Sequence, residues 1–96
     1  YAISARDDTG AKITHVTLRG PNYAEWSKGF RNALGAKGKI HFVTSKVVKP
    51  AETAPDYDAW YQANCTVIAW IFNTIEDKLR STISYRETAF EQWEDI

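Results

Sequence analysis

The chain has 96 residues, which is enough for one domain and too few for two. A hydrophobic content of 44%, with four Trp, five Tyr and four Phe, supports a modest core in which aromatic rings supply much of the buried area. The single cysteine, Cys65, excludes an intramolecular disulfide, and no apolar run reaches the roughly 20 residues that span a bilayer, so we expect no membrane segment.

The formal net charge of zero conceals two halves of opposite sign. Residues 1–50 carry nine Lys or Arg against three acids, a balance of +6, whereas residues 51–96 carry three against nine, a balance of −6. In one interpretation the two halves fold together and their charges offset. In the other, the molecule keeps a positive and a negative side, through which it associates head to tail or presents its positive side to a polyanion.

The first 19 residues show no helical period and are predicted to form an irregular arm, with an extended segment possible over residues 11–20. The polar start lacks the apolar region of a signal peptide. Together with the unpaired Cys65, this favours an intracellular, reducing location, and we expect the cytoplasm. Because no Met precedes Tyr1, we expect the sequence to be a piece of a longer chain.

The first helix is predicted to follow residue 21. Asn22 and Glu25 have the spacing of a capping box, and Gly35 is the expected stop. Gly29 inside the helix indicates either the close approach of a neighbouring backbone or a suboptimal position. Apolar side chains recur on one helical face, at Tyr23, Trp26, Phe30, Ala33 and Leu34.

The middle of the chain is predicted to contain the central helix. Before it, residues 39–50 favour a short helical turn or an extended segment that places Ile40 and Phe42 in the core. Pro55 and Asp56 suit the first turn of the helix. A wide apolar stripe predicts that it is covered on more than one side, through Tyr57, Trp60, Asn64, Val67, Ile68, Trp70, Ile71 and Ile75.

Two shorter helices are predicted towards the C-terminus. One spans residues 76–83, and the other starts at Thr88, where Glu91 has the spacing of a capping box. The second is still apolar and in phase at Ile96, so we expect the helix to continue beyond that residue.

The whole chain, residues 1–96, is therefore predicted to be one all-α domain. An arm over residues 1–19 precedes a small bundle of four to five helices over residues 20–96. The core is expected to be anchored by aromatic side chains in phase with the apolar faces, namely Tyr23, Trp26, Phe30, Trp60, Trp70 and Trp93.

The sequence offers no arrangement typical of catalysis or cofactor binding. His15, His41 and Cys65 lack zinc-ligand spacing, and they would form a nucleophile pair only if the fold joined a cysteine to a histidine. We expect Cys65 to be a small buried side chain. Paired acids stand at predicted helix starts, where they favour the helix dipole, and no glycine-rich phosphate loop is present. We therefore predict a protein that is not an enzyme and takes no metal or cofactor.

One set of basic residues remains ambiguous: Lys28, Arg31, Lys37 and Lys39. Lys28 and Arg31 share the helical face opposite Trp26. Three interpretations of this set are open. It forms a solvated helix face, it makes a weak and sequence-independent contact with nucleic-acid phosphates, or it contacts the acidic half of another copy. The acidic side of such a contact would come from Glu76, Asp77, Glu87 and Glu91.

The ordered motifs of the chain resemble the N-terminal region of the Gag polypeptide of Copia-type LTR retrotransposons. Pro21 and Gly29 depart from the family pattern, which places a small polar residue and a larger helix former there. The resemblance covers essentially the whole chain and is carried by Leu18, Gly20, Asn22, Tyr23, Trp26, Ser27, Ala33, Leu34, Lys37, Lys39, Ile40, Phe42, Val43, Trp60, Asn64, Trp70, Ile71, Asn73, Thr74, Ile75, Thr88, Ala89, Trp93, Glu94 and Asp95.

This resemblance implies a structural, capsid-like domain that self-associates into particles around RNA. It leaves open whether the parent is an active element or a host gene derived from one. A domesticated module that binds a host protein, and a weak non-specific nucleic-acid-binding module, are the alternatives. The zinc knuckle typical of the family does not occur in these residues, so strong sequence-specific RNA binding is not expected from them.

Overall fold

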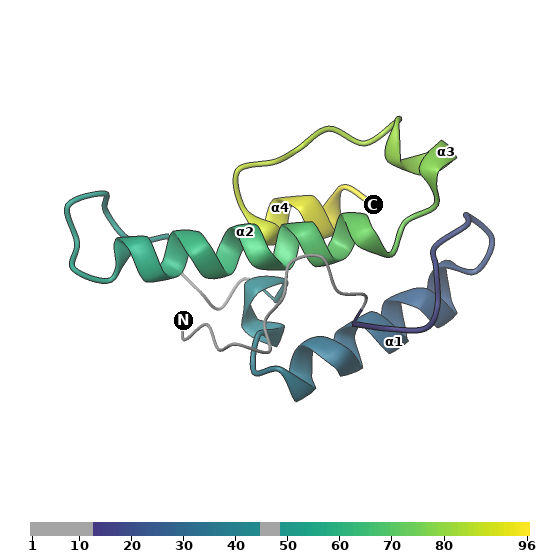
Figure 1. Cartoon of the computed structure of the whole chain (residues 1–96), viewed down its shortest axis with the longest axis horizontal. Helices are drawn as coiled ribbons and strands as arrows, with labels where there is room; N and C mark the ends of the chain where they lie inside the picture. The colour runs from purple at the N-terminus through teal and green to yellow at the C-terminus, as the bar shows by residue number, and fades with distance from the viewer. Residues whose placement is uncertain (1–12, 45–48) are drawn as a thin grey trace.

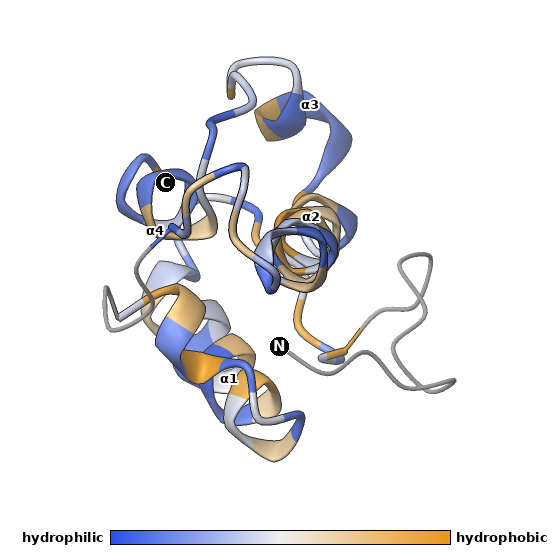
Figure 2. Ribbon diagram, turned by 90° about the vertical axis from the view of Figure 1, so that its left-hand side faces the viewer, coloured by the Kyte–Doolittle hydropathy of each residue, from blue (hydrophilic) through white to orange (hydrophobic). Residues whose placement is uncertain are grey.

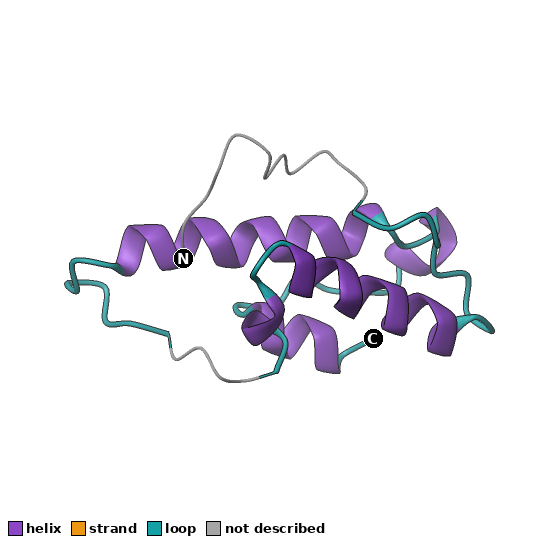
Figure 3. Cartoon of the chain, turned by 90° about the horizontal axis from the view of Figure 1, so that it is seen from below, coloured by secondary structure: helices purple, strands orange, loops and turns teal. Residues whose placement is uncertain are grey.

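The computed structural model describes residues 13–44 and 49–96, and the descriptions below concern these residues. They form α1 (Tyr23–Ala36), the 3-10 turn η1 (Ile40–Phe42), α2 (Tyr57–Asn73), α3 (Asp77–Arg80) and α4 (Ala89–Glu94). Loops join the helices, and no strand is present in the described part of the chain (Figure 3). The all-α prediction is confirmed.

The helix α2 runs along the long axis of the molecule, which measures 41 × 25 × 22 Å (Figure 1). The short helix α4 packs along α2, and η1 packs on α1. Seen along the long axis, α1, α2 and α4 surround a common centre, whereas α3 lies apart from it (Figure 2). Of these helices, α4 makes the extensive contact with α2.

The start of α1 differs from the prediction, because the side chain of Asn22 does not cap the helix. Its amide faces the arm instead. The Arg19 N–H donates to Asn22 Oδ1 at 2.8 Å, and Asn22 Nδ2 donates to the Thr17 carbonyl at 2.8 Å. The same polar atoms cannot bind the first turn of α1 as well, so the predicted capping box with Glu25 does not form.

The end of α1 lies past the predicted stop at Gly35. The helix ends at Ala36, and Gly38 takes the left-handed conformation with φ +70°. The Lys39 N–H donates to the Leu34 carbonyl at 2.8 Å, and the Gly38 N–H donates to the Gly35 carbonyl at 3.1 Å. These two bonds define a Schellman motif, which satisfies carbonyls that the helix end leaves without partners.

Residues 39–44 form a helical turn, the first of the two predicted options. Phe42 and Val43 are buried, and Ile40 packs partly buried against the core. The rest of the predicted segment, residues 45–48, lies outside the described residues.

The buried face of α2 contains Trp60, Trp70 and Ile71, and Ile75 follows the helix end into the core. Cys65 is exposed, so the prediction that it is buried is wrong. It lies on the opposite stripe of the helix, seven residues after Asp58, and this stripe faces away from the core.

The two C-terminal helices are shorter than predicted. A single turn, α3, replaces the helix expected over residues 76–83. The start of α4 is as predicted: the Glu91 N–H donates to Thr88 Oγ1 at 3.2 Å, and the Thr88 N–H donates to Glu91 Oε1 at 3.3 Å. Because every partner of this capping box is local, spacing alone was sufficient to find it.

The centre of the core is a cluster of stacked aromatic rings. The ring centroids of Trp26, Phe30 and Trp93 lie 5.2 to 5.5 Å apart. Trp26 and Phe30 are fully buried, and Trp93 is partly buried against the core. Tyr23 is not a core anchor, because it is 42% exposed at the first position of α1, although its ring lies 6.0 Å from that of Trp26.

The N-terminal arm is held at the end of α2. Leu18 forms an isolated parallel bridge with Ile75: its N–H donates to the Thr74 carbonyl at 2.7 Å and its carbonyl accepts from the Glu76 N–H at 2.9 Å. The extended segment predicted here therefore exists at Leu18. Thr14, which precedes Leu18 in the arm, lies beside Gly29 of α1. A Cβ atom added at position 29 would be only 3.3 Å from Thr14 Oγ1. A close neighbour thus accounts for Gly29, as one of the two interpretations predicted, but this neighbour is the side chain of Thr14 and not a backbone.

Candidate interaction surfaces

The structure separates the four predicted basic contacts. Lys39 is 6% exposed, and its Nζ donates to the Lys37 carbonyl at 3.4 Å. The Nζ of Lys37 lies 5.2 Å from the centre of the Trp70 ring. Both side chains belong to the turn that wraps back from α1 onto the core, so they stabilise that turn. Lys28 and Arg31 remain exposed on α1.

The four predicted acidic contacts all have partners within the chain. Glu76 pairs with Arg19 at 3.5 Å, Asp77 pairs with Arg80 at 2.8 Å, and Glu87 pairs with Lys49. The fourth, Glu91, belongs to the capping box of α4. The hydrogen bond from Lys49 to Glu87 raises the pKa of the lysine.

Two of these ion pairs connect the positive half of the sequence to the negative half, namely Arg19–Glu76 and Lys49–Glu87. The charge asymmetry along the chain is therefore offset in part by folding. Exposed pairs of this kind contribute about 0–1 kcal/mol each, so they balance the charge more than they stabilise the fold.

The longest loop between helices in the C-terminal half is fastened by two buried amides that sequence reasoning did not assign. Asn64, 2% exposed, donates to the Glu87 carbonyl at 2.9 Å and accepts from the Ala89 N–H at 2.8 Å. Gln92, fully buried, accepts from the Arg86 N–H at 2.8 Å and donates to the Ser84 carbonyl at 3.1 Å. The position of Asn64 within an apolar stripe could have indicated this role, because a buried polar side chain requires hydrogen-bond partners.

An ion pair closes the same loop over α4. The Arg86 guanidinium donates to both carboxylate oxygens of Asp95, at 2.9 and 3.2 Å. This hydrogen bonding lowers the pKa of Asp95 and raises that of Arg86. The arrangement is bidentate, and both side chains are partly exposed.

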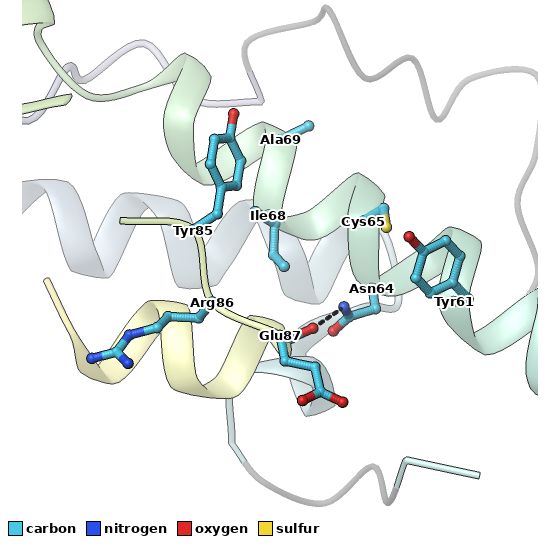
Figure 4. Close-up of a pocket in the computed structure, with 8 residues that line it drawn as sticks. All are labelled: Tyr61, Asn64, Cys65, Ile68, Ala69, Tyr85, Arg86 and Glu87. Carbon is cyan, nitrogen blue, oxygen red and sulfur yellow. Dashed lines mark hydrogen bonds between the residues drawn. The ribbon is translucent and has the colours of Figure 1, made fainter. Parts of the chain in front are cut away.

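The fastened loop forms one wall of a groove beside α2 with a volume of about 360 Å³ (Figure 4). Ile68 contributes to its apolar surface, and the rings of Tyr61 and Tyr85 stand at its two sides. The neighbouring Cys65 thiol raises the pKa of Tyr61. Eight residues line this loop groove, namely Tyr61, Asn64, Cys65, Ile68, Ala69, Tyr85, Arg86 and Glu87.

A second groove, of about 290 Å³, lies where the arm, α1 and the C-terminal end of the chain meet. Tyr23 stands at its side. Aliphatic side chains make up much of its lining, which consists of Leu18, Gly20, Tyr23, Leu79, Thr82, Ile83, Asp95 and Ile96. We call it the arm groove.

Within residues 13–44 and 49–96, no group of three His, Cys, Asp or Glu side chains is placed to hold a metal ion. His15 and His41 are exposed. No helix among the described residues combines the length and the apolar character needed to cross a bilayer. In the same part of the chain, every buried side-chain nitrogen and oxygen has a hydrogen-bond partner. The buried polar groups thus have structural roles.

Comparison with known families assigns the chain. The family model for the Gag-polypeptide of LTR copia-type matches residues 4–51, which is half of the sequence and includes the arm, α1 and η1. The chain therefore belongs to this family, and the resemblance is confirmed by the motifs within residues 4–51. Gag polypeptides are structural and not catalytic, which is consistent with the prediction that this protein is not an enzyme. Searches of curated proteins and of solved structures gave no match.

Proposed function

We propose that this chain is a structural Gag domain that self-associates and contributes to particles around RNA. One observation supports the proposal beyond family membership. The large hydrophobic side chains that stay exposed in the described residues are all tyrosines, Tyr23, Tyr61 and Tyr85, at 42%, 53% and 76% exposure. Each of them lines one of the two grooves. Tyrosine is enriched at protein–protein interfaces because it combines a large apolar ring with a polar tip.

The contact with RNA is proposed to be weak and electrostatic. Of the predicted basic set, Lys28 and Arg31 are the two exposed side chains, so few phosphates are neutralised per copy. For two contacts on a single strand, the slope of log K against log salt is about −1.4. Such a contact does not distinguish one nucleotide sequence from another, because it involves only the phosphates. The free thiol of Cys65 on the surface favours an intracellular, reducing location for the assembly.

Sedimentation velocity over a range of protein concentrations tests self-association directly. We expect the sedimentation coefficient to rise with concentration at low salt. A chain that stays monomeric at every concentration, with and without RNA, contradicts the proposal.

The alternative function is a module that binds a different protein. The loop groove supports it, because its apolar surface is open to any partner with a fitting side chain. Concentration-dependent light scattering separates the two functions: self-association raises the scattering of the purified chain, whereas a heterotypic module stays monomeric without its partner.

A further inference from the structure

The ion pairs of the fold leave exposed charges of both signs without partners. On α1, Lys28 and Arg31 form no ion pair with a described residue. At the start of α2 the same is true of Asp58. Asp58 is therefore among the described acidic residues that folding leaves available to another molecule.

Asp58 belongs to an exposed stripe of α2 that we call the α2 outer face. It consists of Asp58, Tyr61, Cys65 and Ala69, at spacings of three, four and four residues. Three of its members line the loop groove. The face therefore has an acidic end and an aromatic and apolar middle, and no described helix covers it.

A complementary stripe runs along α1, on the side opposite its buried residues. This α1 outer face consists of Ala24, Lys28, Arg31 and Gly35, at spacings of four, three and four residues. Small residues at both ends allow another helix to approach closely, and two long cationic side chains lie between them. Glu25, one turn before Lys28, offsets part of the positive charge, so Arg31 is the main cation of the stripe.

We propose that the α2 outer face receives the α1 outer face of a second copy. The inference rests on the proposed self-association and names the surfaces that carry it. The Arg31 guanidinium would meet the Asp58 carboxylate and the face of the Tyr61 ring, while its aliphatic stem covers apolar surface of the loop groove. Apart from the half-buried Ala69, the members of both stripes are exposed within one copy, so the two stripes do not meet inside the chain.

The occupant is a second copy because the matching surface is present on the same chain. An RNA strand would meet a carboxylate at the acidic end of the α2 outer face, and like charges repel. The contact is heterologous: each bound copy still presents one free α1 face or one free α2 face, so the association continues as a filament or closes as a ring.

Two charge reversals and their mixture test the pairing. Arg31→Glu and Asp58→Arg each place like charges across the contact, and each should raise the dissociation constant for self-association about tenfold at low salt. An equimolar mixture of the two variants should restore part of the association, because the α2 face of the first fits the α1 face of the second. The double variant should associate about as well as the unchanged chain. Lys78→Glu is the matched control, since Lys78 is exposed on α3 and lies on neither stripe.

Circular dichroism establishes that each variant is folded, and Tyr61→Ser provides a second variant that leaves the charge at the helix start intact. Association that is unchanged in both reversals relative to the control overturns this interface and leaves self-association standing. Weakening without recovery in the mixture overturns the direct pairing. An unchanged chain that never associates removes the proposed function itself.

Discussion

The indole N–H of Trp26 donates a hydrogen bond to the hydroxyl oxygen of Thr74 at 3.0 Å, and both residues are fully buried. The Thr74 hydroxyl in turn lies 3.0 Å from the Ile71 carbonyl, one of the carbonyls exposed by the end of α2. One side chain therefore closes α2 and connects it to α1. The start of α1 and the end of α2 are therefore buried against each other, and each supplies a hydrogen-bond partner that the other needs.

Replacing this hydroxyl should destabilise the fold without changing its shape. Thr74→Val keeps the volume and leaves the Trp26 N–H buried without an acceptor, which costs about 1–3 kcal/mol. Urea denaturation measures the loss. The control is Thr66→Val, because the Thr66 hydroxyl bonds only the Gln62 carbonyl of its own helix. Equal losses in the two variants would mean that the bond to Trp26 adds nothing.

Two glycines three residues apart should respond to alanine with opposite signs. Gly38→Ala forces a side chain into the left-handed conformation at φ +70° and should cost about 1–2 kcal/mol. Gly35 lies in α1, and a Cβ there meets no atom within 4 Å. Gly35→Ala should therefore stabilise the protein by about 0.5–1 kcal/mol. Thermal melts of both variants decide the matter, and a stabilising Gly38→Ala would show that the helix ends differently.

The buried amide of Asn64 should be essential for the order of the loop before α4. Asn64→Leu preserves the size of the side chain and removes the partners of the Glu87 carbonyl and the Ala89 N–H, for a loss of about 2–4 kcal/mol. We expect hydrogen exchange at the Ala89 amide to accelerate by the corresponding factor. Gln62→Leu, an exposed change in the same helix, should stay within about 0.5 kcal/mol. Unchanged protection of Ala89 would contradict the assignment.

The Arg86–Asp95 pair predicts a pH dependence of stability. Because the hydrogen bond from Arg86 lowers the pKa of Asp95 in the folded state, the pair stabilises the fold above the ordinary aspartate pKa. This stabilisation is lost as the pH falls through the lowered value. Urea midpoints of the unchanged chain and of Asp95→Asn should therefore differ at pH 6 and converge in acid, as the pH falls through the lowered pKa of Asp95. A difference that persists in acid would assign the effect of the substitution to something other than this charge.

Features that depend on neighbouring residues were predictable from the sequence. Helical periodicity located α1 and α2, and the Thr88–Glu91 spacing located the start of α4. The start of α1 was mispredicted because Asn22 had a competing partner in the arm, which no local pattern reveals.

The surfaces were less predictable because their charges are paired at long range. Arg19 lies 57 residues from Glu76, and Lys49 lies 38 residues from Glu87. Charge counts along the sequence cannot show which carboxylates folding neutralises. The burial of Lys39 has the same origin, since it follows from the path of the chain after α1.

The bridge between Leu18 and Ile75 has a consequence for the synthesis of the chain. Leu18 obtains its backbone hydrogen bonds from residues 74–76, and Trp26 obtains its acceptor from the same place. The segment that matches the Gag family, residues 4–51, therefore lacks the partners that complete its structure until the ribosome has released residue 76. During that interval the indole of Trp26 has no buried site to enter, so the nascent chain exposes the apolar face of α1. Contacts so distant in sequence also slow folding relative to a helical hairpin of the same size.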